Sequence, residues 1–180
     1  MHGRLAAVLA AALMAQTVFG AGAHAGRRAP GFSLPDRTAK QHDPQDFRGK
    51  VVLLDIMRTG CPNCRALTGV LEQIKARYGE RVQVLSIVVL PDNVDSVNSY
   101  IKENNVSAPI LFDCGQVTAS YLKITPQNPT VKFPHLFVID KEGIIRNDFG
   151  HDDADKGGIT AKVLSAEIDR LLAGAAPKKK

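Results

Sequence analysis

The sequence of 180 residues contains no tryptophan, only three cysteines and few aromatic side chains overall. Three cysteines cannot build the disulfide scaffold that replaces a hydrophobic core in small secreted domains. The net charge is +5, but no basic stripe with interleaved aromatic residues is present, so nucleic acid is not expected as a partner. These absences leave an ordinary folded domain that has a hydrophobic core of its own.

The N-terminal segment has the layout of a secretory signal. A short basic start is followed by an apolar run over residues 5–19, and small residues lead to the sequence AHA at 23–25. That ending matches a signal-peptidase site, and the apolar run is short for a membrane span. We therefore expect residues 1–25 to be a cleaved signal peptide and the mature chain to be periplasmic or otherwise exported. An uncleaved membrane anchor is the less favoured alternative.

The rest of the chain is expected to form one domain. No linker or internal repeat divides residues 26–174, and their number is sufficient for a single hydrophobic core. Residues 175–180 end in three lysines and are expected to be a basic, disordered tail.

Hydrophobic patterning predicts alternating strands and helices. The apolar run over 51–57 is typical of a strand buried on both faces. Apolar residues then recur at steps of three and four from Cys64 to Tyr78, which indicates a helix that Gly79 ends. The order of elements predicts an α/β fold whose central strands are parallel, with helices on both faces of the sheet. The further elements expected are strands at 81–90 and 109–114, helices at 92–105, 117–122 and 159–172, and a hairpin of 135–140 with 144–149.

Cys61 and Cys64 form a CPNC pair at the point where the buried strand ends and the helix begins. Cys61 stands near the helix N-cap, and Pro62 takes the first helical position, where proline is favoured. Unpaired backbone N–H groups and the positive end of the helix dipole then face the Cys61 sulfur and stabilise a thiolate. Cys64 begins the apolar stripe and should be less exposed. One activated thiol beside one shielded thiol is the pattern of a dithiol redox centre.

A structural disulfide and a metal site are the alternatives for this pair. Closing so small a ring removes little chain entropy, which disfavours a purely structural role. A zinc site usually takes four ligands, often from two such pairs, and the sequence has no second CxxC. A redox role is therefore favoured.

Asp55 interrupts the apolar strand six residues before Cys61. A carboxylate inside a central strand is costly unless it is paired or functional. Burial would raise its pKa and allow it to exchange a proton with a nearby thiol. The alternative is a solvated carboxylate at a sheet edge, which the apolar neighbours on both sides disfavour.

These features resemble the thioredoxin superfamily, in its exported TlpA-like or ResA-like branch. The resemblance is carried by APGFSLPD at 29–36, FRGK at 47–50, CPNC at 61–64, and Phe133-Pro134 before the strand HLFVID. It implies a thioredoxin-like three-layer fold in which a central mixed sheet has helices on both faces. It also implies that Pro134 forms a cis peptide bond facing the two cysteines.

The resemblance further implies a thiol–disulfide oxidoreductase that acts on proteins, as a reductant. Cys61 would attack a substrate disulfide, Cys64 would resolve the mixed disulfide, and Asp55 would take the proton of Cys64. Substrate-binding residues would be Pro134, Phe133, Pro62 and Asn63.

No cofactor or metal is expected for this activity. The partners would be proteins with disulfides or thiols and a membrane or periplasmic thiol electron donor, and cytochrome c maturation is one process that fits. Two features depart from the family: Gly60 stands where a tryptophan is usual, and the loop 125–132 is longer. The missing tryptophan concerns the surface that docks a partner rather than the chemistry of the cysteines.

Other functions remain as alternatives. A copper-binding chaperone could use Cys61 and Cys64 together with His135. Such chaperones, however, carry their cysteines in a CxxxC pattern, whereas this chain has CxxC. His135 is otherwise interpreted as an ordinary strand histidine. A peroxiredoxin would carry Thr or Ser three residues before its cysteine, where this chain has Arg58. Glutathione-peroxidase-like chemistry would need the missing tryptophan.

Two remaining groups receive structural interpretations. Cys114 closes the strand 109–114 and is expected to be a small buried hydrophobe, with pairing between two chains as the alternative. The acidic sequence HDDAD at 151–155 lacks the downstream glutamate of a calcium loop and is expected to be a polar lead-in to the last helix.

Overall fold

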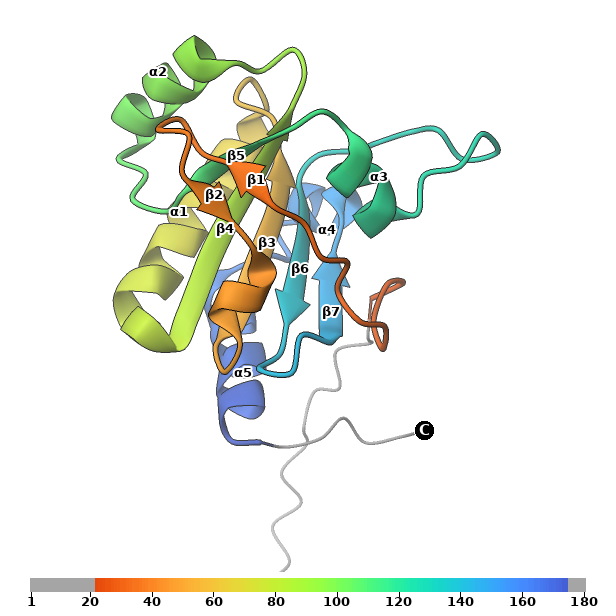
Figure 1. Ribbon diagram of the computed structural model, residues 1–180. Coiled ribbons are helices and arrows are strands. Elements are labelled where there is room, and N and C mark those ends of the chain that lie inside the picture. Colours follow the sequence, from red (N-terminus) through yellow and green to blue (C-terminus); the bar gives the residue numbers. More distant parts are fainter. Residues whose placement is uncertain (1–21, 175–180) are drawn as a thin grey trace, which may run out of the picture.

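The computed structural model describes residues 22–174, so the apolar run of the predicted signal and the predicted tail lie outside the described residues. A five-stranded sheet with the strand order β5–β4–β3–β6–β7 forms the centre of the described part of the molecule (Figure 1). Strands β3, β4 and β5 are parallel, whereas β6 and β7 run antiparallel to their neighbours. The predicted mixed sheet with parallel central strands is therefore confirmed. Its strands are β3 (Val51–Met57), β4 (Val82–Val89), β5 (Ile110–Asp113), β6 (His135–Ile139) and β7 (Ile145–Phe149).

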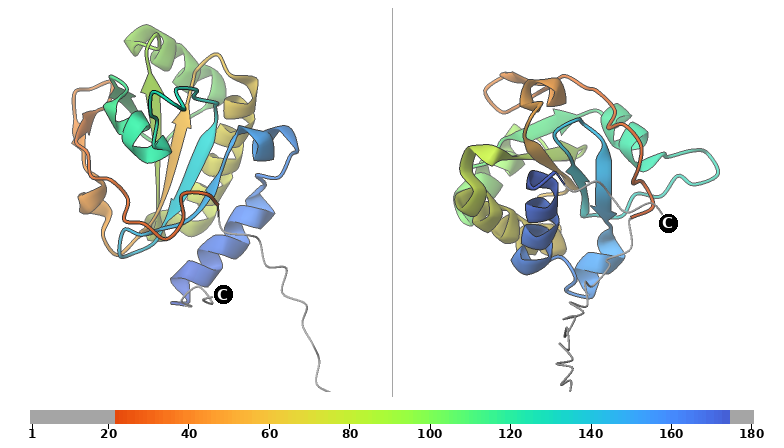
Figure 2. Two further views of the ribbon diagram at one scale, coloured as in Figure 1. Left: turned by 90° about the vertical axis from the view of Figure 1, so that its right-hand side faces the viewer. Right: turned by 90° about the horizontal axis from the view of Figure 1, so that it is seen from below.

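Helices cover both faces of this sheet, which gives three layers (Figure 2). The helices α1, α2 and α5 pack on one face, and α3 packs on the other. The helices are α1 (Pro62–Tyr78), α2 (Val94–Asn104), α3 (Gln116–Leu122), α4 (His151–Asp155) and α5 (Ala161–Leu172). Two short strands, β1 (Leu34–Pro35) and β2 (Gln41–His42), pair beside the main sheet, and the 3-10 turns are Pro44–Phe47 and Gly79–Arg81.

Strand β3 lies in the middle of the sheet, and all seven of its residues are buried. Successive side chains of a strand point to opposite faces. Leu53 accordingly packs among the residues of α1 and α5, while Leu54 packs with Tyr121 of α3 on the opposite face. The continuous apolar run is thus explained by burial on both faces, as the sequence predicts.

Helix α1 begins and ends where its sequence indicates. Cys61 is the N-cap, Pro62 takes the first helical position, and Gly79 follows the last helical residue with a φ of 54°. A positive φ is available to glycine at little steric cost, so Gly79 ends the helix. Because α1 starts directly after the loop that leaves β3, the two cysteines lie at the carboxyl end of the central strand.

The segment 151–155, which the sequence predicts as a polar lead-in to the last helix, forms a short helix of its own, α4, before α5. The Asp153 carboxylate accepts a hydrogen bond from the Gly150 N–H at 2.8 Å and so closes the first turn of this helix. Within residues 22–174, no helix combines the length and apolar character that crossing a membrane requires.

Candidate redox site

The two cysteines of the CPNC sequence are joined by a disulfide bond in the first turn of α1. The Cα atoms of Cys61 and Cys64 are 5.2 Å apart, and the Cys64 N–H donates to the Cys61 Sγ at 3.2 Å. Cys61 is partly exposed, whereas Cys64 is fully buried. The structure therefore contains the accessible and the shielded cysteine that the helix pattern predicts.

The loop before β6 lies against Cys61. The Phe133–Pro134 peptide bond is cis, as the family resemblance implies. The Cys61 Sγ lies 3.8 Å from the Phe133 carbonyl oxygen, and the His151 Nδ1 lies 2.7 Å from the same oxygen. The chain thus brings together residues 61, 133 and 151, which are distant in sequence. A second cis peptide bond, Leu90–Pro91, follows the carboxyl end of β4, which lies beside the carboxyl end of β3. It was not predicted from the sequence.

Asp55 is completely buried in β3, so the alternative of a solvated edge position is wrong. Neither of its carboxylate oxygens has a hydrogen-bond partner among residues 22–174. Burial raises the pKa of Asp55 from 3.8 to about 8, because the charged form loses its hydration without gaining a partner. The alternation of β3 places Asp55 on the same face as Leu53 and Met57, which is the face that α1 covers.

A tyrosine–threonine pair lies near Asp55 and was missed by sequence reasoning. The hydroxyl groups of Thr68 and Tyr100 are 2.7 Å apart in a buried hydrogen bond. Burial raises the pKa of Tyr100, and the charge of Asp55 raises it further. Thr68 follows Cys64 by one helical turn, so the Thr68–Tyr100 hydrogen bond lies on the buried side of α1, one turn after the cysteines. A polar residue inside the apolar stripe of α1 was the available signal.

The loop that precedes Cys61 is held by Asp92, from the turn between β4 and α2. The Asp92 carboxylate accepts from the Arg58 Nε at 3.0 Å and from the Thr59 N–H at 3.2 Å, and also from the Thr59 hydroxyl. The Arg58 guanidinium carbon lies 5.9 Å from the centre of the Phe133 ring. Arg58 therefore connects the loop before the cysteines with the loop that carries Pro134.

The predicted substrate-binding residues differ in accessibility. Pro62 is exposed, Phe133 is partly buried and Pro134 is buried. Asn63 is also beside the disulfide, but its side-chain amide donates a hydrogen bond to the Asp155 carboxylate of α4. Gly60, which stands in place of the usual tryptophan, is exposed.

Cys114 is exposed, so its interpretation as a small buried hydrophobe is wrong. The preceding residue, Asp113, points inward instead and accepts hydrogen bonds from the N–H groups of Val117 and Thr118 at 3.2 and 2.8 Å. Cys114 follows the last residue of β5 and lies outside the strand, before α3.

His135 lies on the sheet face opposite α1. Its ring stacks on Phe137 with ring centres 4.6 Å apart, and its Nε2 lies 2.9 Å from the Asp148 carboxylate. Among residues 22–174, the group of potential metal ligands that lie within 4.8 Å of one another is His24, His135 and Asp148, without either cysteine of the CPNC pair.

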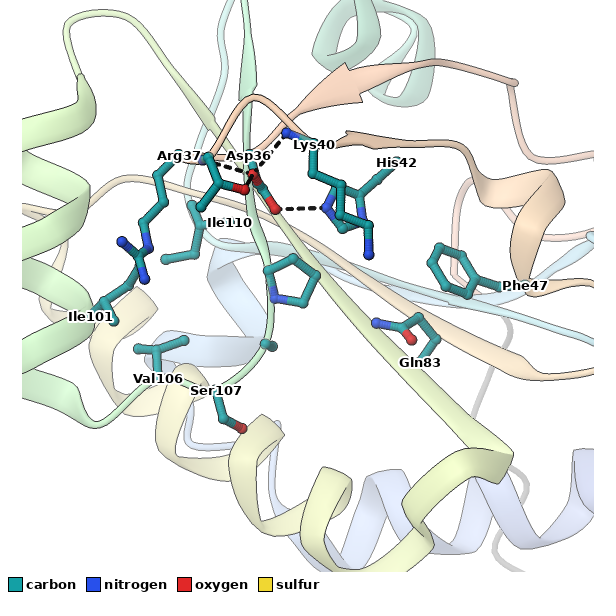
Figure 3. Close-up of a pocket in the computed structure, with 13 residues that line it drawn as sticks. Asp36, Arg37, Lys40, His42, Phe47, Gln83, Ile101, Val106, Ser107 and Ile110 are labelled. Atoms are coloured by element: carbon teal, nitrogen blue, oxygen red, sulfur yellow. Dashed lines mark hydrogen bonds and ion pairs between the residues drawn. The ribbon is translucent and has the colours of Figure 1, made fainter.

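A hollow of about 390 Å³ opens between the β1–β2 hairpin and the segment that joins α2 to β5 (Figure 3). The Asp36 carboxylate in its wall contacts the His42 imidazole at 2.9 Å and accepts from the backbone N–H groups of Thr38 and Lys40. None of the three cysteines is among its lining residues. This hollow is therefore separate from the candidate redox site.

Comparisons with known proteins agree with this geometry. Residues 25–148 match the AhpC/TSA family. The chain is 25% identical over 150 residues to the thioredoxin-like protein YneN of Bacillus subtilis, covering 82% of this chain and 81% of YneN. It is 27% identical over 120 residues to the thiol-disulfide oxidoreductase ResA of Bacillus thuringiensis, covering 66% of this chain and 65% of ResA.

A solved structure confirms the predicted fold. The chain superposes on a secreted disulfide oxidoreductase of Mycobacterium tuberculosis, homologous to DsbE of Escherichia coli, with a TM-score of 0.63. The superposition covers 78% of this chain and 96% of that protein, at 20% sequence identity. At this identity the likeness shows the fold, which is the thioredoxin-like arrangement that the sequence predicts.

Proposed function

The chain belongs to the AhpC/TSA family, and we propose that it is a thiol–disulfide oxidoreductase of protein substrates that acts as a reductant. The observation that carries the proposal is the Cys61–Cys64 disulfide at the N-terminus of α1, with one partly exposed and one buried cysteine. The names of YneN and ResA support the same chemistry for this chain.

The reaction begins with both cysteines as thiols. The Cys61 thiolate attacks one sulfur of the substrate disulfide, which forms a mixed disulfide and releases the other substrate sulfur as a thiolate. Cys64 then loses its proton and attacks the Cys61 Sγ, which closes the Cys61–Cys64 disulfide and releases the second substrate sulfur. Two electrons have passed to the substrate, and a membrane or periplasmic thiol donor returns them by the same exchange in reverse.

The helix terminus activates Cys61 for this attack. The Cys64 N–H already points at the Cys61 Sγ, and it can stabilise a thiolate as a charge-assisted donor. The positive end of the α1 dipole acts in the same direction. Cys64 has no exposed surface, so it reaches a sulfur only after the substrate has been joined to Cys61.

Asp55 is the proton acceptor in this proposal. A thiol has an ordinary pKa of about 8.5, and the buried Asp55 carboxyl has a pKa of about 8. Proton transfer between groups of similar pKa costs little free energy, which favours Asp55 as the base for Cys64. Because Asp55 lies on the α1 face of the sheet, its carboxyl and the buried cysteine share one side of the molecule.

The surface around Cys61 would receive the substrate. Pro62 and Phe133 flank the accessible sulfur, and Pro134 positions the loop beside it. The Asn63 amide, which bonds Asp155, can contribute to substrate binding only if that bond is exchanged.

Export completes the proposal, with the signal contained in residues 1–25 and with residues 175–180 as a tail. It rests on the sequence pattern and on the similarity to a secreted disulfide oxidoreductase. Cytochrome c maturation is one process in which an exported reductant of this kind would act, and the trapped partners described next would identify it.

Replacing each cysteine in turn tests the proposal. With Cys64→Ser the attack on substrate occurs but resolution does not, so mixed disulfides with partner proteins should accumulate in the exported fraction. With Cys61→Ser none should form. Non-reducing gels and mass spectrometry of the trapped partners measure both results, and Cys114→Ser is the matched control that should leave the reduction of insulin disulfides unchanged.

Other results of the same experiment would contradict the proposal. Equal trapping by Cys61→Ser and Cys64→Ser, or trapping that disappears only when Cys114 is replaced, would contradict the assigned roles. Absence of trapping together with stoichiometric Cu(I) binding by the reduced protein would instead support the copper chaperone.

A further inference from the structure

Three side chains with metal-binding atoms gather at β6 and β7, and no cysteine is among them. The potential ligand atoms of His24, His135 and Asp148 all lie within 4.8 Å of one another. The His135 Nε2 is 2.9 Å from the Asp148 Oδ2, and the rings of His24 and His135 meet edge to face with centres 5.4 Å apart. The reaction proposed above uses none of these three side chains.

Backbone contacts hold His24 in this position. The N–H groups of Gly22 and His24 donate to the side chains of Asn147 and Asp148 at 2.9 and 2.8 Å. A Cβ atom at position 22 would overlap the Asp148 Oδ1, so only glycine permits this close approach. The backbone at Gly22 and at His24 is therefore hydrogen-bonded to side chains of β7.

The His24 ring also has an unused ligand atom. Its Nδ1 is buried and has no hydrogen-bond partner among residues 22–174. A buried ring nitrogen without a partner costs free energy, and a metal ion would supply the missing interaction.

We propose that His24, His135 and Asp148 bind a divalent transition-metal ion such as Zn²⁺. Two imidazoles and one carboxylate are a common ligand set for zinc and for other first-row metals. Three protein ligands leave a coordination position free for water or a small anionic ligand. A hollow of about 430 Å³, lined by Thr130, Lys132 and His151 among others, lies next to the three side chains and provides room for it.

The site requires a chain that keeps His24. Cleavage after Ala25 would remove this residue, but the sequence AGA at 21–23 is an equally suitable run of small residues. Cleavage after Ala23 would make His24 the first residue. The backbone nitrogen of His24, which lies 2.8 Å from the Asp148 Oδ1, would then be a free amino group. It could chelate the metal together with the Nδ1 of the same histidine. The proposed site therefore requires cleavage after Ala23 or earlier, in place of the cleavage after Ala25.

Titration of the oxidised full chain with Zn²⁺ tests the site. The disulfide must be closed and Cys114 replaced by serine, so that thiols do not bind the metal. Isothermal calorimetry should detect one equivalent, and His24→Ala and Asp148→Asn should each weaken binding at least tenfold. His42→Gln is the matched control, because His42 also contacts an aspartate, Asp36 at 2.9 Å, and should leave the affinity unchanged.

Binding below one equivalent, or an affinity that His24→Ala leaves unchanged, would overturn the proposal. So would a mature chain from the exported fraction that begins at Gly26, as measured by intact mass. The double variant Cys61→Ser, Cys64→Ser should keep full Zn²⁺ affinity. Failure of the redox proposal and failure of the metal proposal are therefore observed separately.

Discussion

The burial of Asp55 makes the stability of the protein depend on pH. In the unfolded chain its carboxyl ionises with a pKa of 3.8, whereas in the folded chain the pKa is about 8. Between pH 3.8 and about pH 8, the Asp55 carboxyl therefore takes up a proton when the chain folds. The free energy of unfolding is therefore not reduced by Asp55 below about pH 4, and it decreases as the pH rises from about 4 to about 8.

Replacing this carboxyl should therefore stabilise the protein in a pH-dependent way. We expect Asp55→Asn to raise the free energy of unfolding at pH 8 by on the order of 2 kcal/mol, and to have little effect at pH 4. Urea unfolding of the oxidised protein at both pH values measures the difference. Asp46→Asn, at an exposed position, is the control and should show no such dependence. A variant less stable than the wild type at pH 8 would contradict the assignment.

The same substitution should slow the redox reaction. Without a carboxyl to take the proton of Cys64, closure of the disulfide should be slower by roughly ten- to a hundredfold near neutral pH. The wild-type rate should rise through about pH 8, where Asp55 ionises, and the variant should lack this step. Stopped-flow measurement of disulfide reduction gives both profiles. Equal rates from pH 6 to 9 would remove Asp55 from the mechanism.

Among the helices, α2 supports the site from the side. It carries Tyr100, which bonds Thr68 of α1, and its N-terminus follows Asp92, which holds the loop before Cys61. Asn93 caps this helix by accepting from the N–H groups of Asp95 and Ser96 at 2.9 and 3.1 Å. The Ser96 hydroxyl accepts from the Asn93 N–H in return, which completes a capping box.

Loss of this cap should destabilise the fold measurably. Asn93→Ala should lower the free energy of unfolding by about 1 kcal/mol, because two N–H groups of the first turn lose their acceptor. Asn98→Ala, in the exposed middle of the same helix, should be neutral or slightly stabilising, since alanine has the higher helix propensity. Denaturant midpoints compare the two variants. Equal midpoints would mean that the capping box contributes nothing in solution.

In the molecule as a whole, the N-terminal segment covers the β7 edge of the sheet (Figure 1). The Gly26 N–H donates to the Ile145 carbonyl at 2.8 Å, the Ile145 N–H donates to the Arg27 carbonyl at 2.9 Å, and the Ala29 N–H donates to the Gly143 carbonyl at 2.9 Å. An uncovered strand edge pairs readily with another chain, so we expect this segment to protect the molecule from association.

Truncation should show this protection. A chain that begins at Gly31 loses these backbone hydrogen bonds, each contributing about 1 kcal/mol, whereas a chain that begins at Gly26 keeps them. The shorter chain should unfold at lower denaturant concentration and should self-associate in sedimentation velocity. If both chains are equally stable and monomeric, the segment does not serve as an edge cover.

Local patterns were sufficient for most of the elements and for the two cysteines. The period of the apolar residues, the proline after Cys61 and the glycine after Tyr78 act through neighbours in the chain, so strand β3 and helix α1 could be predicted together with their junction. The burial of Asp55 followed from the same reasoning, because a residue surrounded by apolar strand neighbours is buried with them.

Contacts between distant segments could not be read in this way. The bond from Arg58 to Asp92 and the cluster of His24 with His135 and Asp148 depend on how the elements pack, and the sequence contains no local pattern for either. Cys114 was wrongly expected to be buried because β5 ends at Asp113, one residue before the end of the predicted strand 109–114. Hydrophobic period thus determines which elements form, whereas the side chains that meet at their ends depend on the packing of the whole sheet.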